Sequence, residues 1–128
     1  MKQYLIDTNY LLRFLLSDVP QQTKIVRQYF IQAKLGETEI TIPYLAIIEL
    51  DFNLSKLYRF SKTEVVEKLF TLISIPYLNF EKRELLIKAI PLYRQVNFDL
   101  VDILFFCEAK LTGKELLTFD RKLKKLKD

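Results

Sequence analysis

Hydrophobic residues follow two different patterns along this chain. Short apolar runs that stop at a polar residue are typical of buried parallel strands, and longer segments with apolar positions three or four apart are typical of helices. Strands are predicted at residues 4–6, 39–42, 73–78 and 115–118, although Pro76 weakens the third. Helices are predicted at residues 11–16, 20–35, 44–57, 62–72, 81–96 and 100–111, with a short basic helix beginning at Asp120.

Several local signals mark the ends of these elements. Pro20 suits the first turn of a helix and Gly36 its end, while residues 61–64 (Ser-Lys-Thr-Glu) match a capping box. Pro91 must either kink its helix or divide it. Alternating helices and strands with short connections predict one domain over residues 1–128, with a three-layer α/β/α architecture and a mostly parallel sheet of four or five strands.

Composition narrows the class of protein. Half of the 128 residues are hydrophobic and only two are Gly, which argues against disorder. The single Cys107 has no partner for an internal disulfide and is expected to be a small buried residue. Because the apolar runs are too short for a membrane span and no secretory pattern opens the chain, we expect a soluble, cytoplasmic domain.

Charge and the absence of histidine limit the chemistry further. The formal charge is +4, and five Lys or Arg lie between residues 121 and 127, which suits a polyanionic partner or a solvated helix face. The chain contains no His, so His-ligated zinc and Ser-His-Asp or Cys-His catalysis are excluded. Any catalysis must use carboxylates, hydroxyls, Lys, Arg or a metal.

Four acids stand in apolar surroundings. Asp7 and Asp120 each follow a predicted strand, Glu49 interrupts an apolar helix, and Asp102 precedes Ile103-Leu104-Phe105-Phe106. An unpaired buried carboxylate costs several kcal/mol unless its pKa rises until it is neutral. A shared Mg²⁺ or Mn²⁺ removes that penalty, so we predict that these acids converge on a divalent metal at the carboxyl edge of the sheet.

Each acid also has a structural explanation. Asp7 suits a turn, Glu49 a salt bridge across a helix interface, and Asp99 and Asp120 suit N-caps, with Asp102 in a favourable first turn. Their shared placement at the same end of several elements favours the joint site. Asp51, two residues from Glu49, points to the other side of its helix and is left out of the predicted site.

These residues carry a family likeness. The stretches concerned are Ile6-Asp7-Thr8-Asn9 followed by Leu11-Leu12-Arg13, Ile42-Pro43 with Glu49 six residues beyond, Asp102-Ile103-Leu104, and Leu117-Thr118-Phe119-Asp120. Together they resemble the PIN domain, and in particular the VapC-type toxins of toxin–antitoxin pairs. The resemblance covers nearly the whole chain.

The resemblance implies a Mg²⁺- or Mn²⁺-dependent endoribonuclease. Asp7, Glu49, Asp102 and Asp120 would be the catalytic, metal-binding set, with Asp99 as an auxiliary acid. Three polar neighbours would orient ligands or water, namely Thr8, Asn9 and Thr118. A homodimer and a cognate antitoxin protein are also implied. Four aromatic residues are candidates for those interfaces, although core packing is the favoured use for most of them (Phe52, Tyr58, Phe60 and Phe70).

The chain departs from the family pattern in two places. The family adds a final strand after the last acid, whereas this sequence stops at Asp128, so the sheet edge is expected to be shorter or completed by a partner. The position of Asp99 also varies within the family, which leaves its role open.

Three functions compete on these residues. The first is hydrolysis of single-stranded or structured RNA, with Arg13, Arg121 and Lys122 holding phosphates. The second is a catalytically silent module of the same fold that binds RNA or protein. The third is phosphoryl transfer through an aspartyl-phosphate, which is disfavoured because haloacid-dehalogenase-like phosphatases need Asp where this chain has Asn9.

Overall fold

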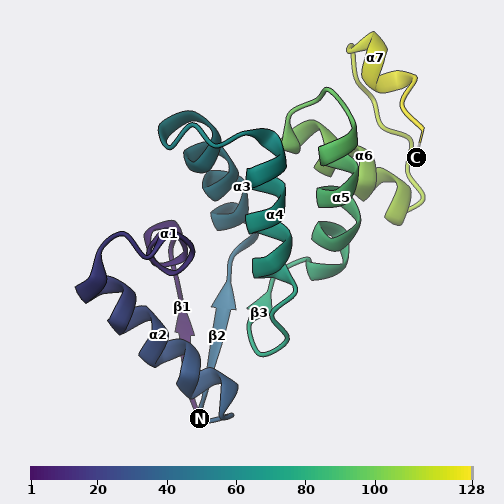
Figure 1. Cartoon of the computed structure of the whole chain (residues 1–128). Coiled ribbons are helices and arrows are strands. Elements are labelled where there is room, and N and C mark those ends of the chain that lie inside the picture. The colour runs from purple at the N-terminus through teal and green to yellow at the C-terminus, as the bar shows by residue number, and fades with distance from the viewer. Residues whose placement is uncertain (128) are drawn as a thin grey trace.

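The fold is built on a small parallel sheet, seen in a computed structural model that describes residues 1–127 (Figure 1). In the described chain the strands lie in the order β1 (Lys2–Leu5), β2 (Thr38–Ile42) and β3 (Asn79–Phe80). Residues 2–5 of β1 pair with residues 38–41 of β2, and the end of β2 pairs with β3. The sheet is therefore parallel, as predicted, but has three strands within the described residues.

Helices surround this sheet and extend well beyond it. Their bounds are α1 (Thr8–Leu16), α2 (Pro20–Lys34), α3 (Tyr44–Phe52), a π-helical turn η1 (Asn53–Leu57), α4 (Lys62–Ile73), α5 (Arg83–Gln95), α6 (Leu100–Leu111) and α7 (Arg121–Lys124). In Figure 1, β1, α1 and α2 lie at one end of the molecule and α6 and α7 at the other, with α3 and α4 between. The predicted mixed α/β class is confirmed.

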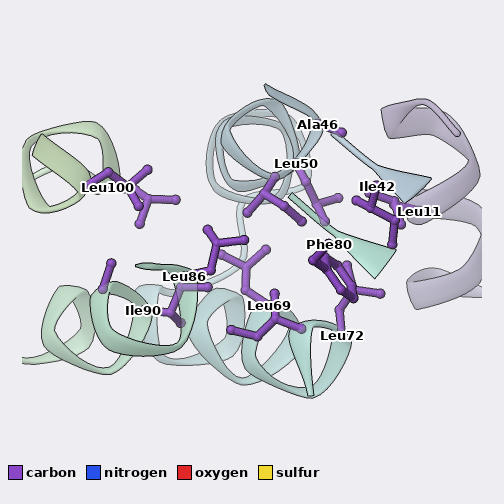
Figure 2. Packing of buried hydrophobic residues seen from close by; sticks show 14 of the residues in the cluster. Leu11, Ile42, Ala46, Leu50, Leu69, Leu72, Phe80, Leu86, Ile90 and Leu100 are labelled. Atoms are coloured by element: carbon purple, nitrogen blue, oxygen red, sulfur yellow. The ribbon is translucent and has the colours of Figure 1, made fainter. Parts of the chain in front are cut away.

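The core lies between the helices and along β2. Ile42 of β2, Leu50 of α3 and Leu69 of α4 are fully buried, as is Leu86 of α5, and their side chains fill the space between these elements (Figure 2). Burying one such side chain contributes about 1.5–3 kcal/mol. Cys107 is also buried, as expected for a small apolar residue. The middle of the molecule thus holds fully buried side chains from a strand and three helices.

The predicted strand over residues 73–78 is wrong. Helix α4 continues to Ile73, which is fully buried, and the following residues form turns before β3 begins at Asn79. The guanidinium of Arg83 donates hydrogen bonds to the carbonyls of Ile73, Ile75 and Leu78. Because one side chain gathers these carbonyls, they are not available for a ladder of strand hydrogen bonds.

The predicted strand over residues 115–118 is not formed either. Residues 114–118 form no regular secondary structure and pair with no other part of the described chain, and Leu117 is 89% exposed. A strand needs a neighbour, and the edge of β1 lies at the other end of the molecule in Figure 1.

Other predicted elements are confirmed. Helix α6 has the predicted bounds, α4 and α2 agree with prediction to within one residue, and the capping box at Ser61 and Glu64 is present. Pro91 lies inside α5 without dividing it. Within residues 1–127, no helix combines the length and apolar character required to cross a membrane.

Candidate functional site

Asp7 lies at the end of β1 and begins α1. Its carboxylate Oδ1 accepts a hydrogen bond from the backbone N–H of Tyr10 at 3.1 Å, so Asp7 is an N-cap as well as a candidate ligand. The side chain is exposed and lines a depression of about 490 Å³ together with Asn9, Tyr10 and Arg13. Thr8, beside Asp7, is buried. The cap hydrogen bond uses Oδ1 of Asp7, so Oδ2 is the oxygen that a ligand can approach while the cap is kept.

A second depression, of about 490 Å³, holds three other acids, Asp99, Asp102 and Asp120. It is lined by Ser55, Lys56, Phe60, Lys62, Tyr93, Asn97, Phe98 and Lys122 in addition to these acids. Burial raises the pKa of Asp102, and the negative charges of Asp99 and Asp120 raise it further. Among residues 1–127 none of the three acids forms a salt bridge, so their mutual repulsion is not offset by an ion pair.

Asp120 repeats the local arrangement of Asp7. Its Oδ1 accepts hydrogen bonds from the backbone N–H groups of Lys122 and Leu123 at 2.9 and 3.0 Å, which caps α7. The hydroxyl of Thr118 accepts a bond from the Asp120 N–H at 3.1 Å. The predicted auxiliary Thr118 therefore fixes the backbone that presents Asp120.

Glu49 lies between these two regions. It is exposed on α3, a helix that contacts both α1 and α6. Within the described chain Glu49 makes no hydrogen bond or salt bridge, so the predicted alternative of an ion pair across a helix interface is not found.

The four predicted acids do not meet within one chain. Among residues 1–127, no three acidic or cysteine side chains lie close enough to hold a metal ion together. Asp7 lines one depression, while Asp102 and Asp120 line the other. The structure thus brings two of the four together, adds Asp99 to them, and leaves Asp7 and Glu49 apart.

The predicted basic residues differ in their surroundings. Arg13 forms a salt bridge with Asp18 at 2.8 Å and donates a hydrogen bond to the Tyr58 hydroxyl at 3.0 Å. Arg121 is exposed, and Lys122 lies at the depression that holds Asp102.

Sequence reasoning missed two lysines, Lys56 and Lys62, that line the acidic depression. Lys62 donates hydrogen bonds to the carbonyls of Val96 and Phe98, which orders the connection from α5 to α6. Burial lowers the pKa of Lys62, while nearby Asp51 and Asp99 act in the opposite direction. Nothing in the pattern around residues 56 and 62 indicates this role, because it depends on the packing of α5 against α4.

Asp51 was left out of the predicted site, yet it lies near it. Its carboxylate accepts a hydrogen bond from the Tyr93 hydroxyl at 2.9 Å. Burial raises the pKa of Asp51, and Asp99 adds to the increase, whereas the bond from Tyr93 and the charge of Lys62 lower it. The partner Tyr93 is 42 residues away, so no local pattern predicts this contact.

Comparison with known proteins places these features in a family. A model of the PIN domain matches residues 4–128 of this chain. The chain therefore belongs to the PIN-domain family. Within it the chain resembles the VapC type: it is 30% identical over 123 residues to a VapC ribonuclease of Aquifex aeolicus (strain VF5), which covers 95% of this chain and 90% of that protein. No solved structure matches the chain.

Proposed function

We propose that the protein is a Mg²⁺- or Mn²⁺-dependent endoribonuclease that hydrolyses RNA phosphodiester bonds, and the toxin of a toxin–antitoxin pair that acts in the cytoplasm. The observation that carries the proposal is the depression that Asp99, Asp102 and Asp120 line without forming a salt bridge among the described residues, with lysines lining the same depression. The similarity to a VapC ribonuclease over almost the whole chain supports the same function.

The donor set fits a hard divalent cation. Mg²⁺ and Mn²⁺ prefer carboxylate oxygens, and an ion would relieve the repulsion that raises the pKa of Asp102. Asp102 and Asp120, with Asp99 beside them, line one depression and would hold it, and Asp7 and Glu49, which lie apart from them within one chain, would complete the ligand set only where they are brought to the same site. When bound, such an ion lowers the pKa of a water molecule and stabilises negative charge on the phosphate.

The side chains around the acids supply the remaining requirements. Lys56 and Lys122 lie at the acidic depression, where an ammonium group can hold a flanking phosphate, and Arg121 is exposed on the helix that follows Asp120. Arg13 would take the same role beside Asp7. Because the chain contains no His, a carboxylate is the side chain available to accept the proton of the attacking water.

The shape of the site favours a particular form of substrate. Asp99, Asp102 and Asp120 line an open depression, so a phosphodiester reaches them most readily where the RNA backbone can bend. A single strand or an RNA loop can adopt this conformation more easily than a duplex. Thr8, Asn9 and Thr118 would orient water or the acids from behind.

A toxin of this type requires a surface for its antitoxin. Phe52, Leu57 and Tyr58 are large, exposed and close in the sequence at the end of α3 and in η1. Tyr58 stacks on Phe60, with ring centroids 6.4 Å apart, and Phe70 is also exposed. We include in the proposal that these apolar residues bind the antitoxin or a second copy of the chain.

The test is RNA cleavage by Asp7→Asn and Asp102→Asn variants in Mg²⁺ or Mn²⁺, compared with EDTA. Each variant should lose at least about 100-fold in rate, because a metal ligand is removed while the shape of the side chain is kept. Asn also caps helices well, so Asp7→Asn should stay folded by circular dichroism. Glu67→Gln, an exposed acid on α4, is the matched control and should cleave like wild type.

Undiminished cleavage by both variants would contradict the proposal. A measurement of RNA affinity with and without EDTA distinguishes a nuclease from the remaining alternative, a catalytically silent binding module. A nuclease of this kind should bind RNA more weakly in EDTA, since its carboxylates then repel phosphate. A silent module would bind equally well or better without metal and would cleave under neither condition.

A further inference from the structure

The outer edge of β1 is unoccupied within residues 1–127. β1 is the first strand in the sheet order, so its backbone pairs with β2 on one side only. Leu5, the last residue of this strand, is 70% exposed. An edge strand with unpaired N–H and C=O groups is a template for a strand from elsewhere.

The stretch over residues 115–119 lacks a strand to pair with, whereas β1 has an edge to which a strand can be added. The stretch is apolar in the middle, forms no regular secondary structure, and pairs with no strand of the described chain. Leu117 is 89% exposed and Phe119 is fully exposed. Covering these two large apolar side chains with another surface would be favourable, because it removes apolar area from water.

The two stretches match in register. Residues 2–7 read Lys-Gln-Tyr-Leu-Ile-Asp and residues 115–120 read Glu-Leu-Leu-Thr-Phe-Asp. A parallel pairing that places Glu115 beside Lys2 joins opposite charges. The same register places Asp120 beside Asp7, at the roughly 4.8 Å spacing of neighbouring strands.

The faces of the two stretches also match. Tyr4 and Ile6 point to the same side of β1, where a cavity of about 250 Å³ lies against Tyr29 of α2. In the register above, Leu117 stands beside Tyr4 and Phe119 beside Ile6. Their side chains would enter this cavity, which would remove both from water.

Within one chain the two stretches lie at opposite ends of the molecule (Figure 1). Helix α6 packs mainly against α5, and α3 and α4 lie between the α6–α7 region and β1. Each chain therefore has an open edge at β1 and an unpaired stretch at residues 115–119 among its described residues, so two copies can pair these segments with each other by a symmetric exchange.

We propose that two copies of the chain exchange residues 115–120, so that this stretch of each adds parallel to β1 of the other. Each complete site then takes Asp7 and Glu49 from one copy and Asp102 and Asp120 from its partner. This accounts for the separation of the four acids within one chain. Only the activity part of the proposal rests on the proposed ribonuclease function.

Disulfide cross-linking tests the exchange without reference to activity. In a Cys107→Ala background, chains with Gln3→Cys and chains with Leu116→Cys, carrying tags of different size, are refolded together and mildly oxidised. These positions face each other in the proposed register, at a Cα separation that a disulfide can span. We expect a cross-linked heterodimer, and none with the control pair Gln3→Cys and Lys88→Cys, since Lys88 is exposed on α5.

A double variant, Gln3→Cys with Leu116→Cys in one chain, shows whether residues 115–120 pair with β1 of a second copy or with β1 of their own chain. Exchange predicts covalent dimers at every concentration at which the protein is dimeric. A disulfide closed within single chains, or no cross-link at all, would overturn the proposal.

Complementation adds the activity readout. Asp7→Asn and Asp120→Asn variants are each expected to be inactive, but a refolded mixture should regain about a quarter of wild-type activity, because half of the dimers are mixed and each has one intact site. No recovery from the mixture, with active wild type, would overturn the composite site. If wild type itself does not cleave RNA but the cross-link forms, the proposed function fails and the exchange stands.

Discussion

Two stretches of this chain have the same pattern, and they end in different structures. Residues 2–6 and residues 115–119 are both short, mostly apolar and followed by an aspartate that caps a helix. The first is a strand because it pairs with β2, whereas the second pairs with nothing in the described chain. The comparison teaches that a strand is a property of two segments, and that an apolar run indicates only a capacity to pair.

The largest expected difference between the two regions is in core stability. Ile40→Ala, at a fully buried position of β2, should lower the free energy of unfolding by about 2–5 kcal/mol. Leu117→Ala should change it by less than about 0.5 kcal/mol, because the side chain is exposed. Urea denaturation, at a concentration where light scattering shows monomers, measures both. Equal losses would mean that residues 115–119 are packed within their own chain.

The next largest difference is expected between the two capping aspartates, in the free energy of unfolding lost when each is replaced by Ala. Asp7→Ala should cost about 1 kcal/mol, because it removes the cap of α1, whose Leu11 and Leu12 are buried in the core. Asp120→Ala should cost only a few tenths, because the four-residue α7 buries only Leu123 within the described chain. Asp7→Asn, which keeps a capping oxygen, is the control and should unfold like wild type in thermal denaturation.

A smaller effect is expected at the capping box of α4 and depends on pH. Hydrogen bonds from the backbone and side chain of Ser61 lower the pKa of Glu64 below its ordinary value of 4.5. The folded state therefore favours the carboxylate, so this contribution is present at neutral pH and is lost as the pH falls below that value. Glu64→Gln should show a shallower loss of stability on acidification. An unchanged pH dependence would contradict this role for Glu64.

The smallest effect is expected at an exposed ion pair. Lys82 and Glu108 lie 2.7 Å apart and join the start of α5 to the end of α6, but both are about half exposed. Lys82→Met should cost roughly 0.2–1 kcal/mol at low salt and less at high salt. A loss that does not depend on salt would show that packing of the Lys82 stem over Tyr44 matters more, since that ammonium lies 4.8 Å from the ring.

Much of the helical structure was predictable because its signals are local. Helix α6 has the predicted bounds, and Ser61, Asp7 and Asp120 cap helices as their residue types suggest. Helical hydrogen bonds and caps join residues only a few positions apart, so the signal lies in adjacent residues. The positions of the acids at the ends of elements were predictable for the same reason.

The features that were not predictable depend on distant partners. Arg83 donates hydrogen bonds to three carbonyls between residues 73 and 78, which are then not available to a strand. Asp51 accepts a hydrogen bond from Tyr93, which lies on another helix. Whether Asp102 meets Asp120 or Asp7 depends on where α6 packs, which no spacing in the chain specifies. Amino-acid order is sufficient to place a carboxylate at the end of an element. Which carboxylates share a site follows from long-range packing, because burial and strand pairing reward contacts between segments far apart in the chain.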